Sequence, residues 1–270
     1  MSQSLEHKVV LITGASSGIG ADAARLFARQ DCRVILSARR VDRLQALAAE
    51  IDGSGGQAMV VPMDVTKRSQ IEAAILKVMQ VYGRIDILFN NAGLGRLDWL
   101  ENLNPEEDID SQIDINLRGL IQVTRTVLPH MLAQRSGCII NMSSMAGLIA
   151  APLYTLYAAT KFGVRGFTDA LRREVSPLGI RVCVLYPGPV ISEFGRRSSQ
   201  SVAKRRIRTP RIFNMSSEYV ARRVVGLARH PRRVLIIPWW FRPIAWLSFH
   251  FPGLIDWLVK IVLVQRSHVV

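Results

Sequence analysis

The sequence predicts a doubly wound α/β domain, and three features of the chain support this fold class. Short runs rich in β-branched residues recur from the N-terminus to about Leu185, and longer segments with helical spacing separate them. No internal repeat or long low-complexity linker divides the 270 residues, of which 49% are hydrophobic. Strands that alternate with helices form a parallel sheet, and right-handed crossovers place helices on both of its faces. We therefore expect one domain with a substantial buried core.

The predicted elements follow one another in a regular order. Strands are expected at residues 9–13, 33–38, 58–62, 85–90, 137–144, 180–187 and 233–238, and helices at 21–30, 41–51, 69–82 and 217–229. After Pro187 the chain becomes polar and basic and contains several glycines and serines. Such a segment is typical of a loop, and we interpret residues at about 190–215 as a lid over the active site.

The formal charge of +14 is concentrated in one stretch of the chain. Residues 196–233 hold twelve lysines and arginines against the single acid Glu218, a net charge of +11. Two interpretations stay open: a solvated arginine-rich face, or attraction to anionic lipid headgroups, an acidic carrier or an acidic substrate. Nucleic acid is not an expected partner, because no stacking aromatics are interleaved with these charges.

The cysteines Cys32, Cys138 and Cys183 lie far apart, each in or beside an aliphatic run. This placement predicts buried thiols rather than a disulfide framework or a metal site, so no metal is expected. The first residues, MSQSLEHK, lack the apolar stretch of a secretory signal, and we therefore expect a cytoplasmic protein.

Three glycines at GxxxGxG spacing follow the first predicted strand and open the first predicted helix. Glycines let the backbone approach a pyrophosphate, while the helix start offers unpaired N–H groups and the positive end of its dipole. The strand before and the helix after favour dinucleotide binding over a simple tight turn. The expected contacts from this loop are Gly14, Ser16, Ser17, Gly18, Ile19 and Gly20.

The sequence resembles the short-chain dehydrogenase/reductase family in three motifs: TGASSGIG at 13–20, NNAG at 90–93 and YAATK at 157–161. Their order and spacing match the family over about residues 8–192. The resemblance implies a single Rossmann-like domain with a seven-stranded parallel sheet and helices on both faces. It also implies an oxidoreductase that interconverts a ketone or aldehyde and an alcohol, and that commonly assembles as a homodimer or homotetramer.

Tyr157 and Lys161 lie four residues apart, so on a helix both side chains project from one face. A nearby ammonium and an oxidised nicotinamide both favour the phenolate, and we expect Lys161 to tune the pKa of Tyr157. By resemblance, Lys161 also binds the nicotinamide ribose. Tyr157 then gives a proton to the carbonyl oxygen during reduction and removes it during oxidation.

Ser144 ends the predicted strand at 137–144, where parallel-sheet enzymes place reacting groups. Its hydroxyl is expected to orient the substrate oxygen; the adjacent Ser143 is the competing candidate, and the resemblance favours Ser144. Asn116 matches the family's fourth catalytic position, where an asparagine holds a water-linked proton path to the lysine. The alternative for Asn116 is a packing or helix-kink amide.

Cofactor preference is predicted at the end of the second strand, where an acid would bind the ribose hydroxyls of NAD(H). Ala38 occupies that position and Arg39 follows, a guanidinium suited to a 2′-phosphate. We therefore expect NADP(H) rather than NAD(H), although Arg39 as a solvated loop charge remains the alternative. Asp64 resembles the family residue that contacts the adenine amine; its alternative is a helix N-cap.

The remaining cofactor contacts are implied by the resemblance alone. The chain after the fourth strand is expected to line the adenosine side of the cleft, and the chain after the sixth strand is expected to contact the nicotinamide carboxamide. These predicted residues are Asn90, Ala92, Gly93, Pro187, Gly188, Val190 and Ser192.

The C-terminal residues 238–270 are rich in tryptophan, leucine and isoleucine, and we separate them as an apolar extension from a catalytic domain at 1–237. The longest uncharged stretch, 243–255, is too short to cross a bilayer, which needs about 20 apolar residues. Two alternatives stay open: a helix buried in a subunit interface or against the core, or a peripheral anchor at a membrane surface.

An apolar tail beside the segment that closes the substrate pocket in this family predicts a lipophilic carbonyl or alcohol substrate. The alternative within enzymes is a 3-oxoacyl carrier-protein or coenzyme A thioester reductase, whose acidic or phosphorylated partner suits the basic stretch. An alternative from another class is a non-catalytic NADP(H)-sensing or membrane-bound scaffold protein. The complete set of Asn116, Ser144, Tyr157 and Lys161 argues against the last alternative.

Overall fold

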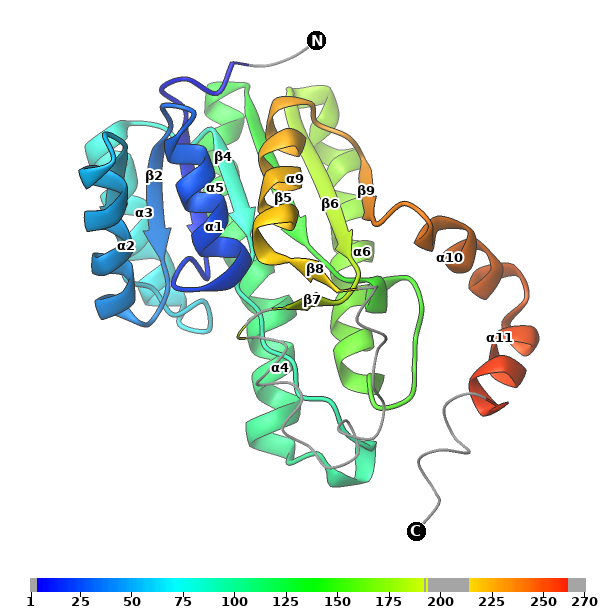
Figure 1. Cartoon of the computed structure of the whole chain (residues 1–270). Helices are drawn as coiled ribbons and strands as arrows, with labels where there is room; N and C mark the ends of the chain where they lie inside the picture. The colour runs from blue at the N-terminus through cyan, green and yellow to red at the C-terminus, as the bar shows by residue number, and fades with distance from the viewer. Residues whose placement is uncertain (1–3, 192, 194–213, 262–270) are drawn as a thin grey trace.

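The structure, a computed structural model, describes residues 4–191, 193 and 214–261. Seven parallel strands form one sheet in the order β3-β2-β1-β4-β5-β6-β9 (Figure 1). They are β1 Val9–Thr13, β2 Arg33–Ser37, β3 Gln57–Val60, β4 Ile87–Asn90, β5 Gly137–Met142, β6 Ile180–Pro187 and β9 Val234–Ile237. The predicted fold class is confirmed. The strand order reverses between β1 and β4, where ligands bind in open α/β sheets.

Helices cover both faces of the sheet (Figure 1). On one face pack α1 (Gly18–Ala28), α2 (Val41–Gly53) and α9 (Ser217–Arg229); on the other pack α3 (Arg68–Tyr82), α5 (Leu120–Gln134) and α6 (Thr155–Val175). The four helices predicted from spacing all form, with ends shifted by at most three residues. Both faces of the sheet are therefore buried, which is why its strands are continuously apolar rather than alternating.

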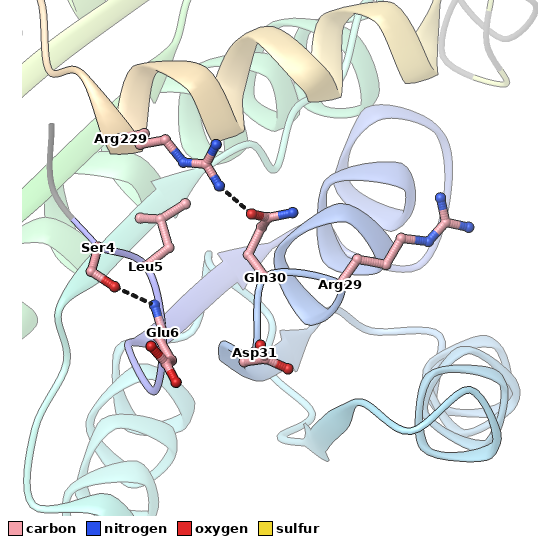
Figure 2. Close-up of a pocket in the computed structure, with 7 residues that line it drawn as sticks. All are labelled: Ser4, Leu5, Glu6, Arg29, Gln30, Asp31 and Arg229. Atoms are coloured by element: carbon pink, nitrogen blue, oxygen red, sulfur yellow. Dashed lines mark hydrogen bonds between the residues drawn. The ribbon is translucent and has the colours of Figure 1, made fainter.

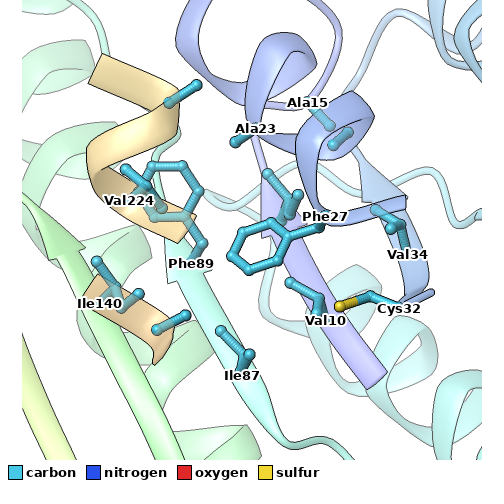
Figure 3. Close-up of a cluster of buried hydrophobic side chains, with 14 of the residues drawn as sticks. Val10, Ala15, Ala23, Phe27, Cys32, Val34, Ile87, Phe89, Ile140 and Val224 are labelled. Carbon is cyan, nitrogen blue, oxygen red and sulfur yellow. The ribbon is translucent and has the colours of Figure 1, made fainter. Parts of the chain in front are cut away.

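The core beneath the predicted cofactor site is built from strands β1 and β4 and from helices α1 and α9, which cover them (Figure 3). Phe27 of α1 and Phe89 of β4 are fully buried there, together with Val10 and Val224. All three cysteines are buried free thiols, which confirms their predicted placement. Large apolar side chains thus pack α1 closely against the sheet.

Short elements complete the chain. They are the 3₁₀ turns η1 (Leu100–Asn102), η4 (Met145–Gly147) and η5 (Ser176–Leu178), the π-helical turns η2 (Pro105–Asp110) and η3 (Asp114–Gly119), and the helical turn α4 (Ser111–Ile113). Strand β7 (Val190–Ile191) pairs with β8 (Met215–Ser216), which brings together the two ends of the predicted lid. Ser192 and residues 194–213 of that lid lie outside the described residues.

Two helices follow the last strand, α10 (Phe241–His250) and α11 (Pro252–Val259). Figure 1 shows them leading away from the sheet. Among the described residues, none of the helices is long and apolar enough to cross a membrane. The division of the chain at 237/238 remains a prediction.

Candidate active site

The glycine-rich loop lies at the carboxyl end of β1, where the chain turns into α1. Gly14 and Gly18 have positive φ angles of 67° and 56°, which side chains disfavour. A Cβ added to Gly14 would lie 2.8 Å from the Cα of Ala92, and one on Gly20 would lie 2.6 Å from Nδ2 of Asn91. Only glycine therefore lets this turn approach the chain after β4 so closely.

The first turn of α1 has the electrostatics of an anion site. Ser17 at the N-cap makes no side-chain capping hydrogen bond, and the first turn contains no acid. The N–H groups and the positive end of the helix dipole are therefore not neutralised by the helix itself. A cofactor pyrophosphate fits this turn, to which all the predicted loop contacts belong: Gly14, Ser16, Ser17, Gly18, Ile19 and Gly20.

Asn91, which the sequence did not single out, ties the glycine loop to the chain after β4. Its Nδ2 donates to the carbonyl oxygens of Thr13 (3.1 Å) and Gly14 (3.2 Å). The backbone N–H groups of Asn91 and Ala92 both donate to Oγ1 of Thr13, at 3.0 and 3.1 Å. These bonds fix the spacing between the two loops that border the cleft.

Asn90 has a different place from its neighbour. Its side chain is buried and Nδ2 donates to Oγ1 of Thr124 and Oδ1 of Asn141, both at 2.9 Å. Asn90 thus links the end of β4 to β5 and α5. A Cβ on Gly93 would lie 3.4 Å from Oδ1 of Asn116, so this end of the motif borders the predicted catalytic residues.

Tyr157 and Lys161 lie one turn apart on the buried face of α6, with exposed fractions of 8% and 4%. Nζ of Lys161 lies 5.6 Å from the centre of the Tyr157 ring. The Ser144 hydroxyl, just beyond β5, is hydrogen-bonded to the Tyr157 side chain and accepts the Ala146 N–H at 3.2 Å. The structure thus brings these three predicted catalytic side chains together at the carboxyl edge of the sheet.

The phenol of Tyr157 is held in its neutral form by its surroundings. Burial raises its pKa, the hydrogen bond with Ser144 acts in the opposite direction, and Tyr154 raises it further. The sequence predicted that Lys161 would favour the phenolate, and the protein alone does not achieve this because desolvation dominates. A neutral phenol is the form that can donate a proton.

Burial also acts on Lys161, whose pKa it lowers from 10.5 to about 8. Its ammonium donates to the carbonyl oxygen of Met142 at 3.1 Å, and few water molecules can reach it. Lys161 therefore exchanges its proton in a neutral to mildly basic range, unlike an exposed lysine.

Ser143 bonds to the backbone of α6. It is 2% exposed and its hydroxyl donates to the backbone carbonyl of Lys161 at 3.1 Å. A Cβ on Gly147 would collide with the same hydroxyl at 2.5 Å. Ser143 fastens β5 to α6, and this geometry favours Ser144 as the serine that faces the substrate.

Asn116 lies in the π-helical turn η3, a rare geometry that is frequent at functional sites. It is 1% exposed, and its Oδ1 accepts the Leu94 N–H at 2.7 Å. Its Nδ2 donates to the Leu94 carbonyl at 2.7 Å and to Oγ1 of Thr160 at 3.2 Å. The side chain therefore holds the loop after β4 against α6. Its catalytic role in a proton path remains a prediction.

The residues predicted for the adenosine end lie at the carboxyl ends of β2 and β3. Arg39 is 66% exposed, and its guanidinium lies 4.0 Å from the carboxylate of Asp64. Asp64 accepts bonds from the N–H and hydroxyl of Thr66, at 3.0 and 2.9 Å. The N-cap of α3 is Lys67 without a side-chain bond, so the alternative N-cap role of Asp64 is wrong.

Arg40, which sequence reasoning missed, contacts the glycine loop directly. Its guanidinium donates to Oγ of Ser16 at 3.0 Å and to Oγ of Ser17 at 2.7 Å. It also donates to the Glu193 carboxylate at 2.9 Å, which Arg43 contacts at the same distance. These two arginines hold the pKa of Glu193 at about 2. The signal in the sequence was the second arginine of the pair Arg39-Arg40, which follows Ala38.

Pro187 ends β6, and Gly188 and Val190 follow it at the same edge of the sheet. The Gly188 N–H donates to the Ile237 carbonyl at 2.8 Å, and a Cβ on Gly188 would lie 2.9 Å from the ring of Phe241. The start of α10 therefore packs on the segment that the resemblance assigns to the nicotinamide. The predicted contact Ser192 lies outside the described residues.

A separate hollow of about 370 Å³ lies at the amino ends of the strands, away from this site (Figure 2). Polar side chains and Leu5 line it, and Arg229 donates to Gln30 across it. It contains none of the predicted site residues. Within the described residues, no cluster of His, Cys, Asp or Glu could hold a metal ion.

The model of the short chain dehydrogenase family matches residues 8–203. The 3-oxoacyl-[acyl-carrier-protein] reductase of Thermotoga maritima is 44% identical over 184 residues, which cover 68% of this chain and 74% of that protein. A metagenomic short-chain oxidoreductase solved with NADP is 31% identical, with a TM-score of 0.72 over 87% of this chain and 97% of that one. The 3-ketoacyl-(acyl-carrier-protein) reductase of Brucella melitensis, solved with NADH, is 30% identical, with a TM-score of 0.78 over 87% and 98%.

Proposed function

The chain belongs to the short-chain dehydrogenase family and is an oxidoreductase acting on CH–OH and C=O groups, and we propose that it prefers NADP(H) and a lipophilic substrate. The observation that carries the proposed catalytic mechanism is the placement of Tyr157 and Lys161 on one face of α6, with the Ser144 hydroxyl on the tyrosine. These groups lie at the edge of the sheet where the glycine loop presents an uncapped helix start.

In this proposal the bound nicotinamide supplies or accepts the hydride. The Tyr157 hydroxyl donates a proton to the substrate oxygen during reduction and takes one back during oxidation. The Ser144 hydroxyl orients that oxygen. Lys161 would hold the ribose of the bound cofactor and pass a proton to the tyrosine, and Asn116 positions the loop beside both residues.

The preference for NADP(H) rests on charge at the end of β2. No acid occupies the position of Ala38, and Arg39, Arg40 and Arg43 follow it. Arg40 reaches the hydroxyls of the glycine loop, where a 2′-phosphate on the adenosine ribose would meet a guanidinium. The NADP of the metagenomic neighbour accords with this preference, whereas the Brucella reductase was solved with NADH.

Reduction of a 3-oxoacyl thioester is the second candidate function. The 44% identity with the Thermotoga maritima reductase favours it, and the basic segment at 196–211 offers charge complementary to an acidic carrier. A homodimer or homotetramer completes the proposal, as the family resemblance implies.

One assay tests these proposals together. Oxidation of NADPH and of NADH is followed at the nicotinamide absorbance band with medium-chain ketones, aromatic aldehydes and 3-oxoacyl thioesters. We expect turnover with NADPH to exceed that with NADH at least about tenfold for a lipophilic carbonyl, as loss of one charge-assisted contact predicts. Preference for NADH contradicts the cofactor assignment, and turnover of thioesters alone favours the second candidate. Tight NADPH binding with no turnover on any substrate contradicts the catalytic assignment and favours a sensor.

A further inference from the structure

The C-terminal helices α10 and α11 have little contact with the domain. No residue of either helix is buried. The first helix packs on the end of β9 and the second packs on the first (Figure 1). Phe241 and Ala245 attach α10 to a small apolar cluster that also contains Met145 and Tyr186. The extension is therefore anchored at its root and exposed beyond it.

Apolar side chains concentrate on this extension. Of the nineteen large hydrophobic side chains exposed in the described residues, ten lie between residues 239 and 261. Trp239 is 71% exposed, Phe249 75%, and Trp246 and Trp257 each 57%. Single exposed hydrophobics are ordinary on a soluble protein, whereas a contiguous group of this kind marks an interaction surface.

The arrangement of these side chains fits a lipid interface. On α11 and in the helical turn directly after it, Leu254, Trp257, Leu258 and Ile261 follow a helical stripe, all exposed. Helices of ten and eight residues are far too short to span a bilayer but long enough to lie in its headgroup region. Tryptophan is the side chain most enriched at that depth, because its ring is apolar and its N–H is polar.

The charge of the chain favours a lipid surface over a second copy of the chain as the partner of α10 and α11. The protein carries a formal charge of +14, and Arg242 and Lys260 flank the exposed aromatics with Asp256 as the single acid of residues 239–261. Residues 239–261 carry two cations against one acid, a net charge of +1, so two copies have no opposite net charge to attract them through this face. An anionic bilayer attracts the same charges, at about 1 kcal/mol for each lysine or arginine near the surface.

We propose that α10 and α11 bind an anionic lipid surface as a peripheral anchor. The root of the anchor lies at the candidate active site, since Phe241 packs against the Gly188 segment and its cluster includes Met145, the residue after Ser144. The cleft therefore lies beside the membrane surface, where a lipophilic substrate is concentrated. This last step rests on the proposed function; lipid binding itself does not.

Vesicle flotation tests the anchor without cofactor or substrate. The full chain is mixed with vesicles of phosphatidylcholine alone or of phosphatidylcholine and phosphatidylglycerol in equal parts. We expect binding to the anionic vesicles to exceed binding to the neutral ones at least about tenfold, and tryptophan emission to shift to the blue. Absence of binding to the anionic vesicles overturns the proposal.

A matched pair of triple variants locates the surface. Trp246→Ser with Phe249→Ser and Trp257→Ser removes exposed rings of the extension, and Leu76→Ser with Val81→Ser and Leu178→Ser removes exposed side chains elsewhere. The first triple variant is expected to lose binding at least about tenfold and the second to bind like the unchanged chain. Equal binding by both variants overturns the assignment to α10 and α11.

Two further measurements test whether a second copy of the chain covers this surface and whether the surface is needed for catalysis. If the first triple variant falls to a smaller oligomer by light scattering and the unchanged chain ignores vesicles, the surface is a contact between copies and the proposal fails. Turnover of a water-soluble ketone is expected to be equal in both triple variants. If only that turnover is lost, the result contradicts the proposed function and does not contradict lipid binding.

Discussion

The predicted catalytic side chains and the C-terminal extension differ most in how the rest of the molecule holds them. Asn116 and Lys161 are 1% and 4% exposed, and both make hydrogen bonds with backbone carbonyls. Trp239 and Phe249 are 71% and 75% exposed, on a segment with no buried residue in its helices. Substitution in the first region should change chemistry or folding. Substitution in the C-terminal extension should change binding to a partner surface and leave chemistry and folding intact.

Tyr157→Phe is the sharpest test of the first region. The ring still fills its place against Ala158 and Leu97, while the proton donor is lost. We expect kcat to fall about 10²–10⁴-fold, the usual share of a general acid, with little change in the NADPH dissociation constant. Stopped-flow turnover and fluorescence titration of NADPH measure the two quantities. A variant that retains more than a tenth of the activity would remove Tyr157 from the role of proton donor.

Phe27→Ala and Phe249→Ala compare the two regions by stability. Phe27 is fully buried between α1 and the sheet, and its truncation should lower the free energy of unfolding by about 3–5 kcal/mol. Phe249 is 75% exposed, and its truncation should change that free energy by less than about 0.5 kcal/mol. Urea unfolding followed by circular dichroism measures both. A large loss for Phe249→Ala would show that the extension packs on the domain in solution.

Burial of Lys161 predicts that both stability and activity depend on pH. This dependence arises from the catalytic side chains and not from the C-terminal extension. Because its pKa is lowered to about 8, the ammonium is present below that pH and lost above it, while an unfolded chain keeps the proton up to about 10.5. The buried charge therefore weakens the fold below pH 8, and this penalty disappears between pH 8 and 10.5. We expect kcat/KM for ketone reduction to fall above about pH 8, by up to about tenfold per unit. A flat profile to pH 10 would contradict the assignment.

Some features of the two regions could be predicted from the sequence and others could not. All seven strands of the main sheet were predicted, because both faces of the sheet are covered and the strands are continuous β-branched runs. The glycine loop was predicted since its positive φ angles need glycine. The neutral state of Tyr157 was not, because it depends on desolvation by elements far apart in the chain. The contact of α10 with Gly188 was hidden for the same reason.

The adjacent residues Arg39 and Arg40 show a limit of prediction from the sequence. The sequence favoured Arg39 as the 2′-phosphate contact because it follows Ala38 directly. In the structure Arg39 is 66% exposed beside Asp64, whereas Arg40 reaches Ser16 and Ser17. The direction of each side chain depends on the backbone turn into α2, which residue types alone do not fix.

A further prediction concerns these two arginines. Arg40→Ala should raise the KM for NADPH about tenfold and leave that for NADH within about twofold, because a guanidinium discriminates by the 2′-phosphate. Arg39→Ala is the matched control. If Arg39→Ala has the larger effect, the assignment drawn from the sequence was the better one.

Glu193→Gln should act in the opposite direction and by less. Its carboxylate accepts from Arg40 and Arg43, and a pKa of about 2 keeps it anionic at any working pH. A 2′-phosphate on the same arginines must compete with that anion, so neutralising it should tighten NADPH binding about threefold and leave NADH binding unchanged. The difference should shrink in high salt, because the groups are partly exposed. Weaker NADPH binding by Glu193→Gln would mean that the carboxylate orients Arg40 for the phosphate rather than competing with it.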